Sequence, residues 1–248
     1  MAAPLESRVE SRYVERPFGD DWDHLDSRWT QHISGSGTHR QLVLPDGASD
    51  ILVDHTGAAF LVGPTADVDI VEIPAGEGFR SLRLRPGALR SAVGVPATEV
   101  RGKVLPLADV VGAATARKLT RITLGGPDDA RSLQRGWLES PPDRRVRGAI
   151  AWLRRYGGRD VSELAEITGL SPRQLRRLLL EHAGLGPKAL QRVFRLQRFL
   201  ALAEQPGTDL GLAEVAVVAG YADQAHLTRE VRSLAGLTPT ALLRHRSA

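Results

Sequence analysis

The sequence predicts an α+β protein in which a β-rich N-terminal half precedes an all-helical C-terminal half. Short β-prone runs separated by turn residues occupy residues 40–84, whereas helical periodicity dominates after about residue 105. The C-terminal half also carries one pattern twice, over residues 160–190 and 209–242. We therefore expect an antiparallel β sandwich or small barrel with associated helices, followed by two helix-turn-helix units joined by a connecting helix.

The β-prone runs of the N-terminal half are short, and Pro, Gly, Asp and Thr residues separate them, which is typical of antiparallel sandwiches and barrels. They cover Arg40–Leu44, Asp50–Asp54, Ala58–Val62, Val68–Ile73 and Phe79–Leu84. The pattern then becomes helical over Leu107–Leu119 and Asp128–Leu138. These two helices are compatible with a hairpin packed on the sheet or with a dimer contact.

A proline pair within Glu139–Asp143 predicts the boundary between two domains, residues 1–140 and 141–248. Ser140 is the expected N-cap of the first helix of the second domain, whose apolar face is carried by Val146, Ile150 and Leu153. A longer helix from Pro187 to about Glu204 is expected to hold the two repeated units at a fixed separation.

Seven pairs of identical residues align the two copies, and the offset between the copies changes once. Three residues recur 51 positions later and four recur 52 positions later, so a single insertion lies between Gly220 and Leu227. The pairs are Glu163 and Glu214, Ala165 and Ala216, Gly169 and Gly220, Leu175 and Leu227, Arg177 and Arg229, Gly184 and Gly236, and Pro187 and Pro239. Two copies of one supersecondary unit explain a register that survives an insertion in the turn.

Each position of the unit has a mechanical role. The alanines allow the second helix to cross the first, and the glycines allow a positive φ in the turn. Asp160 with Glu163 forms a predicted capping box, and Ser171-Pro172 and Thr238-Pro239 begin helices. The expected buried residues are Leu164, Ile167, Leu170, Leu175, Leu178 and Leu179 in the first copy, and Val215, Val218, Tyr221, Leu227, Val231 and Leu234 in the second.

Charge and composition narrow the class of protein. The net charge of +4 divides into +7 over residues 141–248 and −3 over residues 1–140, so the helical half suits a polyanionic partner. The absence of cysteine excludes disulfides, thiolate metal sites and a cysteine nucleophile. With no long apolar run, the sequence predicts a cytoplasmic protein that makes no use of a membrane.

The second helix of a helix-turn-helix unit lies in the major groove of DNA, so its exposed residues are candidate DNA contacts. They are Arg173, Gln174, Arg176 and Arg177 in the first copy, and Gln224, His226, Thr228 and Arg229 in the second. Arginine can bind guanine and glutamine can bind adenine. Alternative roles stay open for Arg177, as a phosphate contact or brace, and for His226, as a cap.

Other polar residues of the helical half have predicted structural roles. Asp223 is expected to cap its own helix, because DNA phosphates would repel its carboxylate. The arginines of the connecting helix, Arg192, Arg195 and Arg198, are expected to pair with carboxylates of their own domain, with phosphate contact as the alternative.

The C-terminal half resembles the AraC/XylS family of bacterial transcription regulators over about Asp143–Arg246, most specifically at Ala219–Pro239, AGYADQAHLTREVRSLAGLTP. Leu179, Leu227 and Val231 stand where family members usually carry phenylalanine. The resemblance implies base contacts from Arg173, Arg176 and Arg177. Residues 44–54 and 82–100 carry a weaker resemblance to the cupin-like sensor domains of that family, which implies effector binding or dimerisation without naming an effector.

The expected function is therefore sequence-specific binding of double-stranded DNA under the control of a small-molecule effector. In an alternative, the N-terminal half only forms a homodimer or contacts RNA polymerase. A cupin-type enzyme is the third class, but His24, His32, His39 and His55 form no His-x-His pair. No catalytic residue, cofactor or metal is therefore predicted. The aromatic residues Phe18, Trp22 and Trp29 can line a pocket or belong to the core.

The geometry of a tandem unit also sets the expected size of the DNA site. Two rigidly joined recognition helices enter successive major grooves about 34 Å apart, which predicts an asymmetric site of roughly 20 base pairs. The first copy presents three arginines, so it is expected to read bases more sharply, whereas the second copy is expected to rely more on the backbone.

Overall fold

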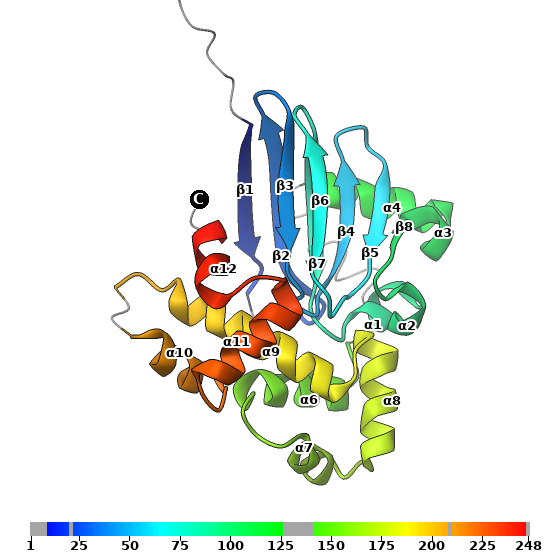
Figure 1. Cartoon of the computed structure of the whole chain (residues 1–248). Helices are drawn as coiled ribbons and strands as arrows, with labels where there is room; N and C mark the ends of the chain where they lie inside the picture. The colour runs from blue at the N-terminus through cyan, green and yellow to red at the C-terminus, as the bar shows by residue number, and fades with distance from the viewer. Residues whose placement is uncertain (1–8, 20–21, 126–140, 208–209, 247–248) are drawn as a thin grey trace, which may run out of the picture.

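The computed structural model describes residues 9–19, 22–125, 141–207 and 210–246. An antiparallel β domain lies above a group of helices (Figure 1), which confirms the predicted order of an α+β chain with its strands first and its helix-turn-helix units last.

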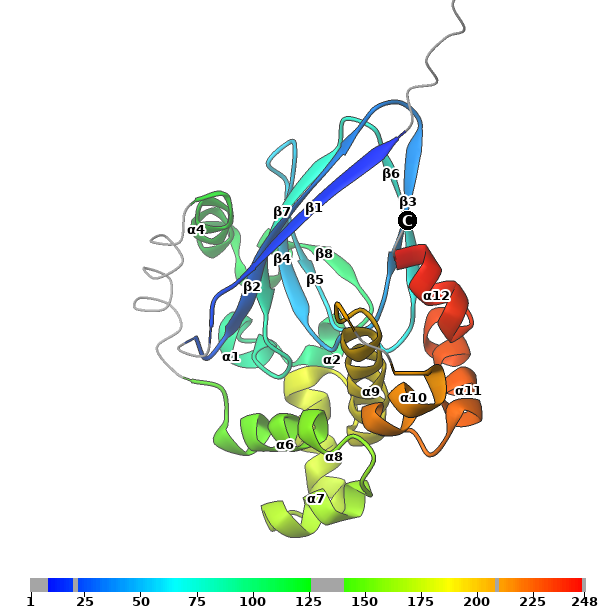
Figure 2. The ribbon, with the colours of Figure 1, turned by 90° about the vertical axis from the view of Figure 1, so that its left-hand side faces the viewer.

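The N-terminal strands form a six-stranded sheet and a separate two-stranded ribbon. Every pairing in both is antiparallel, as predicted. The sheet has the order β1 (Glu10–Pro17), β2 (Leu25–Ser34), β7 (Gly78–Leu84), β4 (Ser49–Asp54), β5 (Ala59–Val62) and β8 (Val104–Pro106), and the ribbon pairs β3 (Thr38–Val43) with β6 (Asp69–Pro74). Figure 2 shows the ribbon on one side of the sheet and α4 on the other.

The strands β1, β2 and β8 were not predicted from the sequence. The edge strand β1 is exposed along its whole length, so it has no need of the apolar alternation that marks a half-buried strand. Many side chains of β2 are polar, and they lie in polar networks or face solvent, so this strand also lacks a clear apolar alternation. Even Trp29 takes part in such a network, because its Nε1 donates to Asp50 over 2.7 Å.

Helices α3 (Leu107–Val111) and α4 (Ala113–Leu124) pack on the sheet, and α1 (Leu89–Val93) and α2 (Ala97–Val100) lie at the end of the sheet that faces the C-terminal helices (Figure 2). The predicted helix at 107–119 is divided by Gly112, whose φ of +78° ends α3. Leu61, Leu82 and Leu119 lie in the core between the sheet and these helices. The predicted helix at Asp128–Leu138 and the first two residues of the predicted domain boundary, Glu139 and Ser140, lie outside the described residues.

The C-terminal helices are α6 (Arg144–Arg155), α7 (Val161–Thr168), α8 (Pro172–Ala183), α9 (Pro187–Ala203), α10 (Leu212–Ala219), α11 (Gln224–Ala235) and α12 (Pro239–Arg246). The N-cap of α6 is Asp143, whose carboxylate accepts from the backbone N–H of Arg145 over 2.7 Å. Ser140, the predicted cap, is not the residue that caps α6, because the helix begins three residues after the expected position; Ser140 itself lies outside the described residues.

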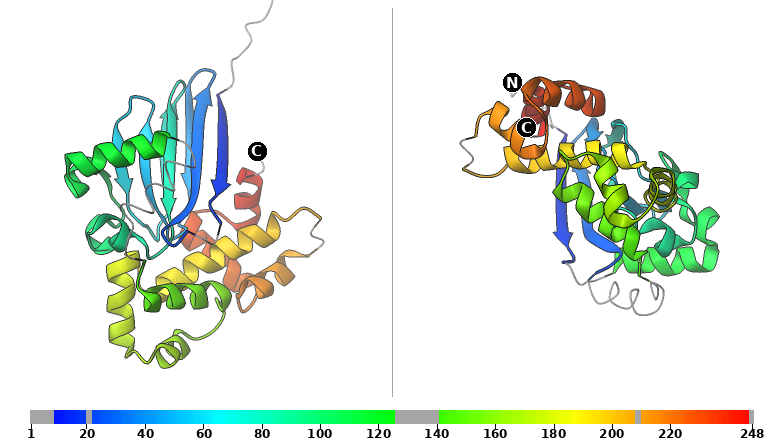
Figure 3. Two further views of the ribbon diagram at one scale, coloured as in Figure 1. Left: turned by 180° about the vertical axis from the view of Figure 1, so that it is seen from behind. Right: turned by 90° about the horizontal axis from the view of Figure 1, so that it is seen from below.

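The connecting helix α9 contributes to two separate apolar cores, as its predicted spacing role requires. Val193 and Phe194 pack with α6, α7 and α8, whereas Leu196 and Phe199 pack with α10, α11 and α12. Figure 3 shows α9 running between the two groups of helices. Because one helix fills both cores, neither unit can rotate without disturbing its packing.

Candidate nucleic-acid interface

The first helix-turn-helix unit consists of α7 and α8. Gly169 ends α7 with a φ of +65°, the left-handed conformation predicted for the turn. Asp160 caps α7 by accepting from the N–H of Ser162 over 3.0 Å. The predicted capping box is wrong in its second half, because the carboxylate of Glu163 accepts from Arg159 at 3.0 Å and not from the backbone.

The recognition helix α8 begins with a complete capping box. Ser171 Oγ accepts from the N–H of Gln174 over 3.3 Å, and Gln174 Oε1 accepts from the N–H of Ser171 over 2.9 Å. The side-chain carbonyl of Gln174 is therefore occupied. A bidentate contact with adenine needs that oxygen as an acceptor, so such a contact would require the cap to open. Arg173, Arg176 and Arg177 are exposed beside it.

The second unit consists of α10 and α11, with Gly220 at a φ of +100° in its turn. Asp223 caps α11, as predicted, by accepting from the N–H of His226 over 2.6 Å. Glu214 Oε2 accepts from the N–H of Gly211 over 2.9 Å and so takes part in the cap of α10.

Two of the four candidate DNA contacts of the second unit are engaged within the protein. His226 Nδ1 accepts from the N–H of Ala222 over 3.2 Å, and the ring stands edge-on to Tyr221 at 5.4 Å. Thr228 Oγ1 donates to the carbonyl of Gln224 over 2.8 Å. Exposed side chains remain at Gln224 and Arg229. The exposed residues of the second face are thus less cationic than those of the first.

Two residues expected in the core are exposed instead. Ile167 is 67% exposed and Val218 is 44% exposed, and they occupy equivalent positions in the two copies. Each lies in the last turn of an eight-residue helix, where the stripe that packs on the unit is already complete: Leu164 and Ala165 are buried in α7, and Val215, Ala216 and Ala219 in α10. The other predicted core residues are buried or half-buried.

Glu230 ties the second recognition helix to the connecting helix, and sequence reasoning missed it. Its carboxylate lies 2.6 Å from Arg195 Nη2 and 3.2 Å from Arg192 Nε. Arg195 is buried and also donates to the carbonyl of Gly157 over 3.1 Å. Arg198 donates to the carbonyl of Arg155 over 3.2 Å. Arg192 and Arg195 therefore pair with a carboxylate of their own domain, as predicted, whereas Arg198 bonds a backbone carbonyl instead of a carboxylate.

The turn of the second unit lies directly against the first half of the domain. A Cβ atom added to Gly220 would lie 2.9 Å from the backbone nitrogen of Gly158 and 3.2 Å from the carbonyl carbon of Gly157. Glycine is needed here both for the positive φ and for the close approach of two backbones. This contact, the Glu230 ion pairs and the two cores of α9 hold the two recognition helices in one rigid arrangement.

The first recognition helix is partly covered by the N-terminal domain. Helix α2 packs on α8 near Gly184, where an added Cβ would lie 2.7 Å from Pro64 Cγ and 3.2 Å from the carbonyl oxygen of Ala97. A groove of about 610 Å³ lies between the two helices. Its lining joins Pro96 and Thr98 to Arg173, Gln174, Arg176, Arg177, Leu180 and Glu181.

Further contacts fasten the two domains. Arg90 of α1 pairs with Glu181 of α8, and Asp23 pairs with Arg147 of α6. Gln197 of α9 donates to the carbonyl of Pro45 over 2.7 Å. The candidate base-reading face of α8 thus opens onto a groove whose other wall belongs to the N-terminal domain. No sequence pattern signalled these contacts.

Comparison with known proteins agrees with this architecture. Residues 164–245 match a family described as a helix-turn-helix domain, and residues 23–106 match a domain of unknown function. The transcriptional regulator GlxA of Rhizobium meliloti is 34% identical over 85 residues, which cover 34% of this chain and 26% of that protein. The chain is also 42% identical over 82 residues, 33% of its length, to a probable bifunctional transcriptional activator/DNA repair enzyme AlkA of Mycobacterium tuberculosis, of which it covers 16%.

A solved structure of a probable AraC family transcriptional regulator from Rhodopseudomonas palustris is 23% identical, with a TM-score of 0.36, and the match covers 42% of this chain and 97% of that one. This chain spans only about a quarter or less of the curated relatives that it matches. Residues 164–245 are therefore a helix-turn-helix domain, as the sequence predicted. Among the described residues, no helix is long and apolar enough to cross a bilayer.

Proposed function

We propose that the chain is a cytoplasmic, sequence-specific DNA-binding transcription regulator, with residues 141–248 as its DNA-binding domain and residues 1–140 as its controlling domain. The rigid pairing of two recognition helices supports this proposal most strongly. The described C-terminal helices offer two exposed helix faces in fixed relation, and the first face carries Arg173, Arg176 and Arg177. Such a pair fits successive major grooves of one duplex. An enzymatic role has no comparable support.

Within this proposal the two units have unequal tasks. Arg173 and Arg176 read bases, because they are exposed on α8 and arginine can bind guanine through two hydrogen bonds. Arg177 and Arg229 occupy equivalent positions and contact phosphate in both units. Gln224 is the candidate base contact of α11. Gln174, His226 and Thr228 shape the helices that present these residues, since each already has a partner in its own unit.

The covering of α8 favours a controlling N-terminal domain over one that only dimerises. Pro96 and Thr98 stand across the groove from the arginines of α8. A duplex that received α8 in its major groove would meet α2, so full engagement of the first unit requires the two domains to separate. An effector that binds the open arrangement better would then raise DNA affinity by its differential binding energy.

Selection of DNA from a random pool by the full chain tests the proposal. We expect an enriched site of roughly 20 base pairs without internal symmetry, in which two conserved blocks lie about one helical turn apart. Absence of any enriched sequence, or enrichment of a single block of a few base pairs, would refute the proposed use of both units.

A further inference from the structure

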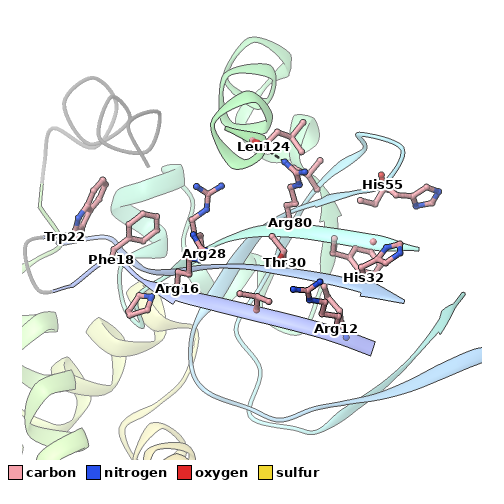
Figure 4. Close-up of a pocket in the computed structure, with 17 residues that line it drawn as sticks. Arg12, Arg16, Phe18, Trp22, Arg28, Thr30, His32, His55, Arg80 and Leu124 are labelled. Atoms are coloured by element: carbon pink, nitrogen blue, oxygen red, sulfur yellow. Dashed lines mark hydrogen bonds between the residues drawn. The ribbon is translucent and has the colours of Figure 1, made fainter. Parts of the chain in front are cut away.

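A second cleft lies in the N-terminal domain, away from the groove at α8. It encloses about 1100 Å³ on the side of the sheet that carries α4. Figure 4 shows Arg28 and Arg80 directed toward this side, below Leu124 at the end of α4. The strands β1, β2 and β7 supply its floor. Its basic lining residues are Arg12, Arg16, Arg28, Arg80, His32 and His55.

The positive charge of this cleft is concentrated at paired positions of β1 and β2. Arg16 and Arg28 are direct partners across β1 and β2, and Arg12 is the direct partner of His32. Like charges opposite one another destabilise a sheet. Among the described residues, no ion pair within 4 Å joins a carboxylate to Arg12 or Arg16, whereas His55 of the lining pairs with Glu77 over 2.6 Å.

The single acidic residue in the described lining, Asp54, does not offset this charge. Its carboxylate accepts from the backbone N–H groups of Thr56 and Ala58, both at 2.9 Å, and so serves the turn after β4. Arg80 donates to the carbonyl of Leu124 over 2.9 Å, which holds its side chain at the edge of the cleft. An arginine has five N–H donors, so this bond leaves most of them available.

On the opposite face of the same sheet, carboxylates of the protein itself balance the charge of an arginine. Arg83 lies 3.3 Å from Glu15, 3.5 Å from Asp46 and 3.4 Å from Asp50. One arginine there has three carboxylate partners inside the protein. In the cleft, Arg12 and Arg16 have no such partner among the described residues, and the carboxylate of Asp54 already serves its own turn. Within the described part of the chain, the arginines of the two faces therefore differ in how far carboxylates balance their charge.

We propose that this cleft binds a small organic anion with at least two carboxylate or phosphate groups and an apolar body. The guanidinium groups suit paired oxygens of such groups. Phe18 and Trp22, whose rings lie 4.7 Å apart, line one end together with Val14 and Leu124, and they suit the apolar body. This ligand is the effector of the proposed regulator, so its regulatory role rests on the proposed function, whereas binding itself does not.

The cleft is separated from the second recognition helix, which disfavours DNA as its occupant. Helix α4 lies behind the sheet in Figure 1 and in front of it in the reverse view of Figure 3, whereas α11 lies on the opposite side. The cleft is instead next to the contact between the two domains in the sequence. Trp22 of the cleft immediately precedes Asp23, which pairs with Arg147 of α6. A ligand seated against Trp22 would bear on that pair.

Calorimetric titration of the full chain with benzene-1,3,5-tricarboxylate and, separately, with pyrophosphate at constant ionic strength tests the proposal. We expect one molecule of at least one probe to bind per chain, and the preferred probe tells carboxylate from phosphate ligands. The double variant R12A/R16A should weaken binding by at least about tenfold, since charge-assisted hydrogen bonds are lost. Both residues lie on an exposed edge strand, so the fold should persist, as a thermal melt checks.

The matched control is R40A, which removes an arginine that is 68% exposed and paired with Glu72 on the ribbon. Its affinity for the probe should equal that of the parent chain. Binding of neither probe, or equal weakening by R40A, overturns the proposal. If neither probe binds and R12A/R16A lowers the salt dependence of DNA binding, the cleft contacts DNA phosphate, which also overturns it. If the chain binds a probe but enriches no DNA sequence, the anion site is supported and the proposed regulatory function is wrong.

Discussion

Glu230 shows how a single residue positions a recognition helix. Its carboxylate faces Arg192 and Arg195 of α9, and the side chains of Arg195 and Glu230 are only 10% and 13% exposed. Removing one partner from a buried ion pair leaves the other charge without compensation, which is more costly than the pair is worth. The orientation of α11 on α9 therefore depends on this carboxylate more than on any exposed contact.

We expect Glu230→Gln to lower the free energy of unfolding by about 3 kcal/mol, because Arg192 and Arg195 lose their shared counter-charge. Urea denaturation measures the change. Glu204→Gln is the matched control: its pair with Arg246 is 34% and 42% exposed, so its loss should cost less than about 1 kcal/mol. Equal effects of the two variants would show that Glu230 does not hold α11 on α9 as described.

His182 gives the domain contact a pH dependence. Burial and then the nearby Arg90 guanidinium hold the pKa of this imidazole below its ordinary value of 6.5, and its Nδ1 atom is buried without a hydrogen-bond partner among the described residues. Because the folded chain resists the proton that the unfolded chain accepts, stability should fall as the pH drops below about 6.5. The melting temperature should fall less between pH 7.5 and 5.5 in H182Q than in the parent; an identical fall would contradict this.

At the scale of elements, the close contact between Gly220 and Gly157-Gly158 fixes the two units together. Gly169 provides a natural comparison, since both glycines end a helix with positive φ but nothing lies within 4 Å of a Cβ added at Gly169. Alanine in the left-handed region costs about 1–2 kcal/mol. Only Gly220 adds a steric conflict with a neighbouring backbone.

Gly169→Ala should therefore cost about 1–2 kcal/mol of unfolding free energy, and Gly220→Ala clearly more. Chemical denaturation of both variants makes the comparison. The DNA site selected by G220A should also lose the fixed spacing of its two blocks, because the turn must move away from Gly158. A G220A variant as stable as G169A would mean that the backbone contact does not restrain the units.

The helices of the tandem units were predictable because their signals are local. Gly169, Gly220, Ser171 and Asp223 act within a few residues of their own positions, and the structure places each in the expected turn or cap. Position within a unit was less predictable. Ile167 and its counterpart Val218 have core-like side chains but lie where no neighbouring helix reaches them.

Features that depend on distant partners could not be predicted. The edge strand β1 has no apolar face to reveal it, since its residues form cleft and solvent surface. The groove between α2 and α8 joins residues that are 75 to 85 positions apart in the sequence, and nothing near Pro96 or Thr98 indicates a helix-turn-helix partner. The uneven strength of the two reading faces was visible as arginine content, but the engagement of His226 and Thr228 was not.

For the whole molecule, the contact of α1 and α2 with α8 sets how readily the first unit meets DNA. Arg90→Glu would place a second carboxylate against Glu181 and weaken that contact. We expect R90E to bind the selected DNA site more tightly than the parent, as measured by fluorescence anisotropy, although the variant is less cationic. R40E makes the same charge change on the ribbon and should weaken DNA binding slightly. Equal weakening in both would contradict the covering role.

The unequal roles of the two units are the central claim, and one measurement tests them most directly. DNA selected from a random pool by R173A and by R229A is compared with DNA selected by the parent chain, and affinity is followed against salt. We predict that R173A loses preference at one or two base pairs, with about 1–3 kcal/mol less discrimination there. R229A should weaken binding to all sequences alike and lower the slope of log affinity against log salt concentration by about one. Uniform weakening by R173A, together with lost base preference in R229A, would contradict the account.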